Sequence, residues 1–244
     1  MAYRRFFIPP ELICDKEARL PDAEARHLRN VLRIREGERV EIFDGEGGGW
    51  SGAVEFRRGE VFVCGLTQID DSRSQPSAAR ITLAMAMIKP ARFEWALEKV
   101  TEVGADVIIP VYTSRSEIRI PVEKISGRLA RWERITKETS KQCQRLDVPL
   151  VRTPLEFRGF LSSEECSIQN KILFYEESTN KWRPEQTGNA GGTIICIGPE
   201  GGWAKDEIEF AEKSGCGVFS LGPRILRAET AAVAAVSIFL HSNL

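Results

Sequence analysis

Two glycine-proline segments in the last quarter of the chain have the residue types of a small-molecule site. They are IGPEGGW, residues 197–203, and LGPRILRAETAA, residues 221–232. Each follows a β-type run and leads into a helical pattern. In open α/β sheets, ligands bind outside the carboxyl ends of the strands. One such segment alone is more typical of a turn, but the pair predicts a pocket in which main-chain N–H and C=O groups meet a ligand.

Basic residues accompany this predicted pocket. We expect the helix after the second segment to begin with Arg224 and Arg227, which would give the pocket a positively charged lip. From Tyr112 to Arg145, nine basic residues oppose four acidic ones, although the formal net charge of the whole chain is −1. Such segregation is typical of a phosphate-binding surface, and a solvated helix face over residues 123–141 explains it equally well. Six N-terminal arginines extend the basic set: Arg4, Arg5, Arg26, Arg29, Arg33 and Arg35.

Other kinds of chemistry have little support in the residues. The six cysteines form no CxxC pair and the chain has only two histidines, so we expect neither a metal site nor a Ser-His or Cys-His pair. His27 lies among arginines, where a contact to RNA and a structural role are both open. Residues 47–52 satisfy G-x-G-x-x-G, but no helix pattern follows them, which predicts a hairpin loop and not a dinucleotide site. We therefore expect a bound cofactor to supply the reactive group.

Bulk composition points to an ordinary globular protein. The chain is 42% hydrophobic and 28% charged, as is usual for soluble proteins. The N-terminal apolar run is interrupted by Pro9 and Pro10, which is not typical of a signal peptide. The apolar run over residues 231–240 is too short to cross a bilayer. We expect a cytoplasmic protein without a membrane partner.

Two patterns of secondary structure divide the chain. Up to about residue 70, short alternating strands and one helix, Asp22–Leu32, predict a small β-barrel. Beyond it, strands and helices alternate, which predicts an α/β domain with a largely parallel sheet covered on both faces. We predict domains at 1–72 and 78–244 with a polar linker at 73–77. The expected strands are 38–43, 51–56, 60–66, 81–87, 107–111, 172–175, 193–197 and 217–221, and the other expected helices are 92–103, 123–144, 205–213 and 228–240.

Six sequence blocks together have the pattern of one known family. They are RHLRNVLRIREGE (26–38), FDG (43–45), IKPARFEWALEKVTEVGADVIIPVYTSRS (88–116), QCQRLDVP (142–149), IGPEGG (197–202) and LGPRILRAETA (221–231). On these blocks, over nearly its whole length, the chain resembles the RsmE family of bacterial 16S rRNA (uridine-N3) methyltransferases, in the SPOUT superfamily. Much of that family has Glu where this chain has Lys141, so the resemblance implies no role for an acid there.

The resemblance implies a fold, a cofactor and partners. The fold is an N-terminal PUA-like β-barrel followed by a SPOUT α/β domain with a deep trefoil knot. The cofactor is S-adenosylmethionine, the substrate is 16S rRNA or the 30S subunit, the enzyme is a homodimer, and no metal is used. The implied cofactor-binding residues are Phe174, Tyr175, Glu176, Ile197, Gly198, Pro199, Glu200, Gly201, Gly202, Leu221, Gly222, Ile225, Leu226, Thr230 and Ala231.

The resemblance also implies a mechanism at uracil N3 in the decoding region. We expect Arg227, Arg224 and Arg115 to stabilise the charge that develops on the base, and Glu200 or Glu229 to accept the proton. For Glu229, a first-turn acid that complements the helix dipole is an alternative. The expected RNA-binding residues are Arg4, Arg5, His27, Arg29, Arg33, Lys89, Arg92, Arg115, Gln142 and Arg145. A non-catalytic rRNA-binding or assembly factor with the same fold is the alternative function.

Overall fold

The chain forms two compact units. The computed structural model describes residues 4–69, 80–166, 170–182 and 192–241, and the predicted linker at 73–77 lies outside the described residues. One unit holds Met1–Pro76 together with Lys137–Val148, and the other holds Ser77–Thr136 together with Pro149–Leu244. The first unit is therefore built from two separate stretches of the sequence.

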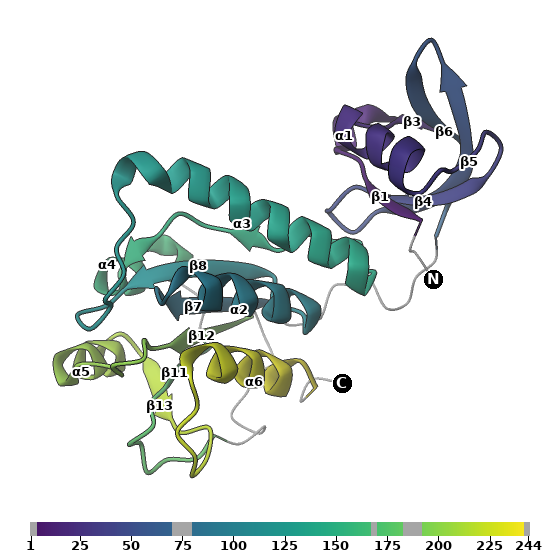
Figure 1. Ribbon diagram of the computed structural model, residues 1–244. Coiled ribbons are helices and arrows are strands. Elements are labelled where there is room, and N and C mark those ends of the chain that lie inside the picture. The colour runs from purple at the N-terminus through teal and green to yellow at the C-terminus, as the bar shows by residue number, and fades with distance from the viewer. Residues whose placement is uncertain (1–3, 70–79, 167–169, 183–191, 242–244) are drawn as a thin grey trace. The chain divides into compact units, whose positions relative to one another are not determined.

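The first unit is a six-stranded sheet that curls around its own apolar core (Figure 1). Its order is β1-β4-β5-β6-β3-β2, and neighbouring strands are antiparallel except for β1 and β4. Phe6, Leu28 and Ile42 are among its fully buried side chains. The strands are β1 (Arg5–Phe7), β2 (Ile13–Cys14), β3 (Glu17–Arg19), β4 (Arg39–Phe43), β5 (Gly49–Arg57) and β6 (Glu60–Gln68).

The helix predicted over Asp22–Leu32 is present in this unit with nearly the same bounds. Helix α1 (Asp22–Arg26) continues without a break as a π-helical turn, His27–Val31. The N-cap of α1 is Pro21, and Asp22 is the first helical residue. The G-x-G-x-x-G sequence lies where β4 turns back into the antiparallel β5, and Gly47 there has a φ of +109°. The predicted hairpin is confirmed.

The second unit is built on a parallel sheet. Its order is β10-β8-β7-β12-β11-β13, with β9 paired to β8, and every pairing is parallel. All six residues of β7 and all six of β8 are buried, which is expected for parallel strands covered on both faces. The strands are β7 (Ile81–Ala86), β8 (Val107–Tyr112), β9 (Leu150–Val151), β10 (Leu155–Glu156), β11 (Asn170–Phe174), β12 (Thr193–Ile197) and β13 (Cys216–Phe219).

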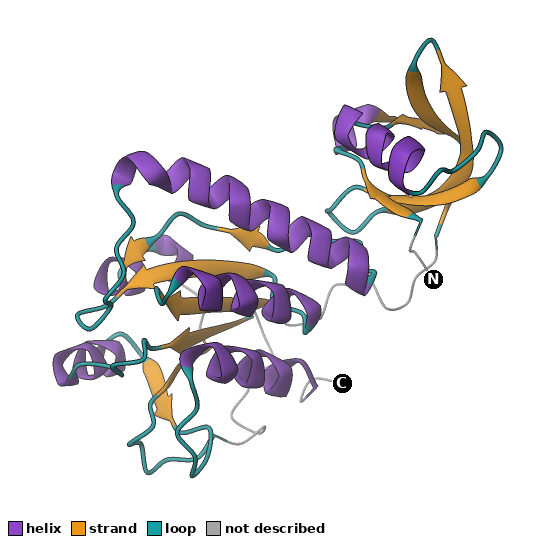
Figure 2. Cartoon of the chain, viewed as in Figure 1, coloured by secondary structure: helices purple, strands orange, loops and turns teal. Residues whose placement is uncertain are grey.

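Helices cover both faces of this sheet (Figure 2). Leu83 and Met85 of β7 point to a core shared with α2, α3 and α6. Ala84 and Ala86, which alternate with them, point to a second core shared with α4 and α5. The predicted largely parallel α/β sheet is confirmed. The helices are α2 (Pro90–Glu102), α3 (Val122–Cys143), α4 (Phe157–Leu161), α5 (Lys205–Lys213) and α6 (Ala228–His241).

The strands that precede the glycine-proline segments, β12 and β13, are separated in the sheet by β11. One local expectation is wrong. Arg224 and Arg227 do not begin a helix, since α6 starts at Ala228. Both arginines therefore lie on the loop between β13 and α6. Within the described ranges, no helix is long and apolar enough to span a membrane.

Candidate functional site

A pocket of about 230 Å³ opens at the carboxyl ends of three neighbouring strands, β12, β11 and β13. The loop that follows each strand supplies part of its wall. The first glycine-proline segment follows β12, the second follows β13, and residues 174–176 follow β11. The lining residues are Phe174, Tyr175, Glu176, Ile197, Gly198, Pro199, Glu200, Gly202, Trp203, Ser220, Leu221, Gly222, Arg224, Ile225, Leu226, Arg227, Ala228 and Ala231.

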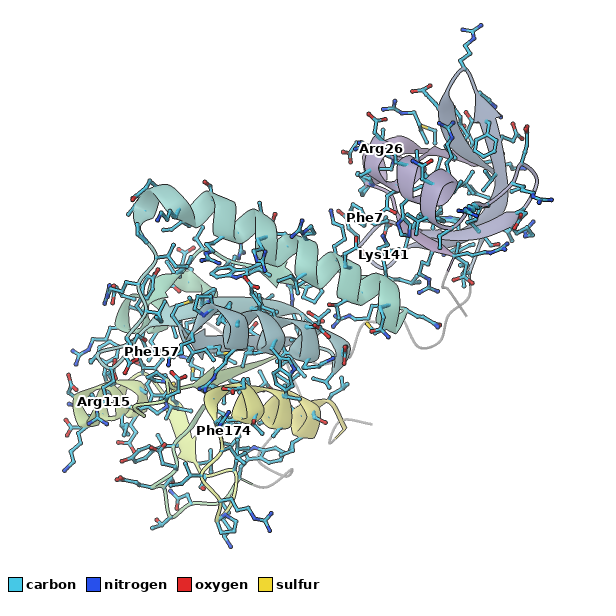
Figure 3. All side chains as sticks on the ribbon, viewed as in Figure 1. Phe7, Arg26, Arg115, Lys141, Phe157 and Phe174 are labelled. Atoms are coloured by element: carbon cyan, nitrogen blue, oxygen red, sulfur yellow. The ribbon has the colours of Figure 1, made fainter. Side chains whose placement is uncertain are left out.

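The loop after β12 is anchored by a buried tryptophan. The Trp203 indole is 2% exposed, its ring centroid lies 4.5 Å from that of Phe157, and its Nε1 donates to the carbonyl of Phe174 at 3.0 Å. Phe157 and Phe174 are labelled in Figure 3. The same loop closes on itself where the Gly202 N–H donates to the carbonyl of Pro199 at 2.9 Å. Its backbone is thereby fixed against the end of β11.

Gly202 permits a close approach that other residues would block. Its φ is +69°, and a Cβ built on it would lie 2.7 Å from Oε1 of Glu176. The left-handed conformation and the missing side chain therefore both favour glycine here. The Glu176 carboxylate lies against the backbone of the loop after β12, and both residues line the pocket.

A buried carboxylate ties this loop to the segment after β8. Glu207, 3% exposed, accepts hydrogen bonds from the backbone N–H of Ser114 at 2.8 Å and of Ala204 at 3.0 Å. Nearby, Nη1 of Arg115 (labelled in Figure 3) donates to the carbonyl of Gly201 at 2.9 Å. Arg115 is thus brought beside the loop, as the expected charge-stabilising role requires.

The loop after β13 differs in that its arginines point outward. Its start is fixed, because the Ser220 hydroxyl donates to the carbonyl of Gly222 at 3.0 Å and accepts from the Gly222 N–H at 3.2 Å. Arg224 and Arg227 are exposed and line the pocket. Neither makes an ion pair with a residue that the structure describes.

The segment after β11 runs beside β13. Its backbone is held by hydrogen bonds from the Tyr175 N–H to the carbonyl of Phe219, at 2.8 Å, and from the Ser220 N–H to the carbonyl of Asn180, at 2.7 Å. The Tyr175 hydroxyl donates to Oε2 of Glu177 at 2.5 Å. This hydrogen bond, with a smaller contribution from burial, raises the pKa of Tyr175 to about 12.

Arg92 connects two acids that the sequence does not place near each other. Its Nη1 donates to Oε1 of Glu200 at 2.8 Å, and its Nε lies 3.8 Å from Oε1 of Glu229. Glu229 is 7% exposed, and its Oε2 is buried with no hydrogen-bond partner among the described residues. The first turn of α2, where Arg92 lies, is thereby linked to the pocket loop and to the first turn of α6.

The pocket gathers most of the expected cofactor-binding residues. Of that set, only Gly201 and Thr230 are absent from its lining, and Gly201 bonds Arg115 instead. Three lining residues are absent from that set: Trp203, Ser220 and Ala228. Trp203 and Ala228 lie within the two predicted glycine-proline segments, whereas Ser220 lies just before the second segment and nothing in the sequence distinguishes it.

Two of the expected RNA-binding residues make bonds within the chain that account for them. Arg5 is 5% exposed and donates from Nε and Nη2 to Oε2 of Glu41, at 2.9 and 2.7 Å, so it ties β1 to β4. Arg92 holds Glu200 and Glu229, as described above. In the first unit, Arg4 pairs with Glu38, and Arg29 donates to the carbonyl of Glu60 at 3.0 Å. Arg145 is only 14% exposed at its side chain and pairs with Asp147, to which its Nε donates at 3.2 Å. The remaining members are exposed on their own units: His27, Arg33, Lys89, Arg115 and Gln142.

Much of the basic run from Tyr112 to Arg145 is neutralised by acids from elsewhere in the sequence. Arg128 and Arg131 face Glu94 at 3.6 and 2.6 Å, and the hydrogen bond from Arg131 lowers the pKa of that carboxyl. Arg119 pairs with Glu156. Lys141 bonds Glu24 at 2.9 Å, with side chains only 13% and 12% exposed. Lys141 therefore has a local ion-pairing role inside the first unit.

Comparison with known proteins identifies the family. Residues 75–240 match the model of an RNA methyltransferase domain, and residues 20–71 match that of an RNA methyltransferase PUA domain. The parallel sheet with its three-loop pocket thus belongs to an RNA methyltransferase. A relative from Synechocystis sp., Ribosomal RNA small subunit methyltransferase E, is 31% identical over 241 residues, which cover 97% of this chain and 77% of the relative. This chain belongs to the ribosomal RNA small subunit methyltransferase E (RsmE) family.

Two solved structures are similar to this chain over nearly its whole length. One is a ribosomal RNA small subunit methyltransferase E from Neisseria gonorrhoeae bound to S-adenosyl methionine, 29% identical with a TM-score of 0.83, covering 97% of this chain and 96% of that one. The other is a methyltransferase from Legionella pneumophila in complex with the same cofactor, 28% identical with a TM-score of 0.86, covering 99% and 98%. The predicted family and fold class are confirmed, and so is the predicted cofactor at the level of the family.

Proposed function

We propose that this chain transfers a methyl group from S-adenosylmethionine to N3 of a uridine in 16S rRNA, in the decoding region of the small ribosomal subunit. The observation that carries the proposal is the composition of the pocket. Its lining combines backbone and apolar side chains with the carboxylates of Glu176 and Glu200. The same lining includes Arg224 and Arg227, which are exposed and have no acidic partners among the described residues. Apolar surface with two carboxylates suits a small cationic cofactor, and the exposed arginines suit an anionic polymer outside the pocket.

The lining residues fit S-adenosylmethionine chemically. Leu221, Leu226 and Ala231 provide apolar surface for an adenine ring, and the carboxylates of Glu176 and Glu200 complement a ligand with two cationic centres. Gly222, with a φ of +132°, has no atom within 4 Å of where a Cβ would lie, so the wall there is open backbone. When bound, the cofactor supplies an electrophilic methyl group on a sulfonium sulfur.

The arginines have the task of making uracil N3 nucleophilic. N3 of uracil carries a proton, and its loss leaves negative charge on the two carbonyl oxygens of the base. Arg224 and Arg227 at the pocket mouth, with Arg115 beside Gly201, stabilise that charge electrostatically. The base must leave its stack to reach the pocket.

Of the two expected proton acceptors, the geometry favours Glu200. Its side chain is 34% exposed and lines the pocket, so it can take the N3 proton and pass it to water. Arg92 orients it at 2.8 Å. Glu229 does not line the pocket, and it acts through Arg92 as a positioning residue in the first turn of α6, where a carboxylate also complements the helix dipole.

RNA contacts are proposed on both units. In the first unit we assign His27, Arg29 and Arg33, with Arg4, Gln142 and Arg145 as further contacts. In the second unit we assign Lys89 and Arg115. Such cationic contacts are expected to make binding weaken as salt rises.

The test is methyl transfer from labelled S-adenosylmethionine to naked 16S rRNA and to 30S particles, both from a bacterial strain that lacks this modification. We expect N3-methyluridine at one position, identified by mass spectrometry of the digested RNA. Methylation of another atom, or no methylation of either substrate, would contradict the proposal. Calorimetry with S-adenosylmethionine distinguishes the proposed enzyme from the alternative function. A non-catalytic assembly factor would bind the RNA without binding S-adenosylmethionine.

A further inference from the structure

Ile225 is the most exposed large apolar side chain in the described part of the chain, at 86%. It lies in the loop after β13 and contributes to the mouth of the pocket. Leaving an isoleucine in water forgoes the stabilisation that its burial would give. A single exposed apolar residue is common on protein surfaces. The exposure of Ile225 therefore indicates a function only together with the structure and charge of the loop around it.

The loop that presents Ile225 is anchored on both sides. On one side, the hydroxyl of Ser220 bonds both polar backbone groups of Gly222. On the other, the Ala231 N–H donates to the carbonyl of Arg227 at 2.8 Å, which begins the hydrogen bonding of α6. Leu226, the next residue, is half-buried and lines the pocket. Ile225 therefore points outward from a backbone whose neighbouring side chain is packed inward.

The residues around Ile225 are cationic. Arg224 precedes it and Arg227 follows Leu226, and both arginines are exposed. The acid closest in sequence, Glu229, is 7% exposed and points to Arg92. The exposed surface of this loop thus combines one apolar side chain with two positive charges. Charge complementarity favours an anionic partner with an apolar face, such as RNA, over a second copy of the same basic loop.

We propose that Ile225 is the apolar wedge that enters the base stack of the RNA when the target uridine leaves it, so that the base turns toward Arg224 and Arg227 at the pocket. The proposal rests on the proposed function, because it assigns the step that delivers the base to the pocket. Proteins that unstack bases commonly insert Ile, Leu, Met or Phe between them. Ile225 lies at the rim of the cavity into which the base would turn.

The experiment uses the full chain and RNA stems from the decoding region that carry 2-aminopurine beside each candidate uridine. The fluorescence of 2-aminopurine rises when it becomes unstacked. We expect the wild type to raise it on binding and Ile225→Ala to lose most of that rise. Methylation of the stem by Ile225→Ala should be slower by about tenfold to a hundredfold, the factor that burial of one such side chain supports. With a single-stranded oligonucleotide, whose bases are less stacked, the loss should be much smaller.

Two further variants and two measurements serve as controls. Ile225→Met keeps a long apolar side chain and should restore both signals. Val122→Ala removes a residue of the same unit that is 83% exposed but outside the pocket, and it should behave as the wild type. Ile225 is one of the implied cofactor-binding residues and lines the pocket, but its side chain is 86% exposed. The wedge therefore predicts that Ile225→Ala changes neither the dissociation constant for S-adenosylmethionine, measured by calorimetry, nor the sedimentation coefficient.

Each failure has a distinct signature. An undiminished fluorescence rise in Ile225→Ala, or an equal loss of rate on stem and single strand, overturns the wedge and leaves the proposed function standing. A change in sedimentation assigns Ile225 to contact between two copies, and weaker cofactor binding assigns it to the pocket wall. A wild type that unstacks the stem without methylating it refutes the proposed function alone. A wild type that neither binds nor methylates the stem refutes both.

Discussion

The two glycine-proline loops have similar sequences at their starts and opposite structural roles. The loop after β12 is tied down by a buried indole, by Arg115 on the Gly201 carbonyl and by Arg92 on Glu200. The loop after β13 is fixed near its ends and keeps its charged side chains in solvent. The Gly-Pro dipeptide therefore determines where each strand ends, while the residues after it determine whether the loop is bound to the fold or left available to a partner.

This difference between the two loops predicts different effects of substitution. Substitutions in the loop after β12 should lower stability first, and substitutions in the loop after β13 should lower activity without lowering stability. Three variants test this division and a fourth tests the segment after β11, in order of decreasing expected effect.

Trp203→Ala should cause the largest loss of stability. The indole is buried, contacts Phe157 and donates a hydrogen bond to Phe174, and removal of such a side chain costs about 3–5 kcal/mol. Chemical denaturation of the two proteins measures the difference, with Trp203→Phe as the variant that keeps an aromatic ring. A loss below about 1 kcal/mol would show that the first loop is not anchored by its tryptophan.

Arg227→Ala should lower the methylation rate by about a hundredfold, the usual effect of removing one preorganised charge-stabilising group. Its free energy of unfolding should change by less than about 0.5 kcal/mol, because the side chain is exposed. Lys213→Ala, an exposed cation at the end of α5 and outside the pocket, is the matched control and should leave the rate unchanged. Equal rates for wild type and Arg227→Ala would remove this arginine from the mechanism.

Glu207→Ala should destabilise the protein by about 1–3 kcal/mol, because it leaves two backbone N–H groups without their acceptor. These are the N–H groups of Ser114 and Ala204. Glu207→Gln keeps one carbonyl oxygen and should recover part of the loss. Thermal unfolding measures both variants, and an unfolding temperature for Glu207→Ala equal to that of the wild type would contradict the assigned role.

Tyr175→Phe should have the smallest effect, and a pH-dependent one. The pKa of Tyr175 is raised to about 12 in the folded protein, against about 10 for an unperturbed tyrosine, so the fold favours the neutral hydroxyl. Its contribution is fully present below about pH 10 and is lost as the pH rises toward about 12. Because the side chain is partly exposed, the contribution is small. Absorbance of tyrosinate, titrated in both proteins, should give a difference curve with a midpoint near that value, and a midpoint near the unperturbed value would contradict it.

The sequence predicts the residues that line the pocket better than it predicts the charge of the protein surface. Gly198, Gly202 and Gly222 lie in two glycine-proline segments that each follow an apolar run, and the pair predicts a pocket although one such segment alone is more typical of a turn. The third loop, residues 174–176, came only from the family resemblance, since the position of β11 between β12 and β13 depends on sheet order, which local patterns do not encode.

The charge of the basic run over residues 112–145 also depends on contacts that local patterns do not encode. Glu94, Glu156 and Glu24 come from distant parts of the sequence and neutralise Arg131, Arg119 and Lys141. A count of charges along consecutive residues cannot include such partners. Arg224 and Arg227, by contrast, line the pocket and form no ion pair with an acid in the described part of the chain.

The first unit is assembled from two separate stretches of the sequence, and this has a consequence for folding during protein synthesis. Its sheet begins within the first residues of the chain, yet its structure also requires Leu146, whose carbonyl accepts from the Gly47 N–H at 3.2 Å, and Lys141, which pairs with Glu24. A ribosome adds about 5–20 residues each second, so the N-terminal strands wait several seconds for these contacts. A nascent chain released before residue 141 would leave Glu24 without its cation, so the folding of the first unit depends on more than half of the chain.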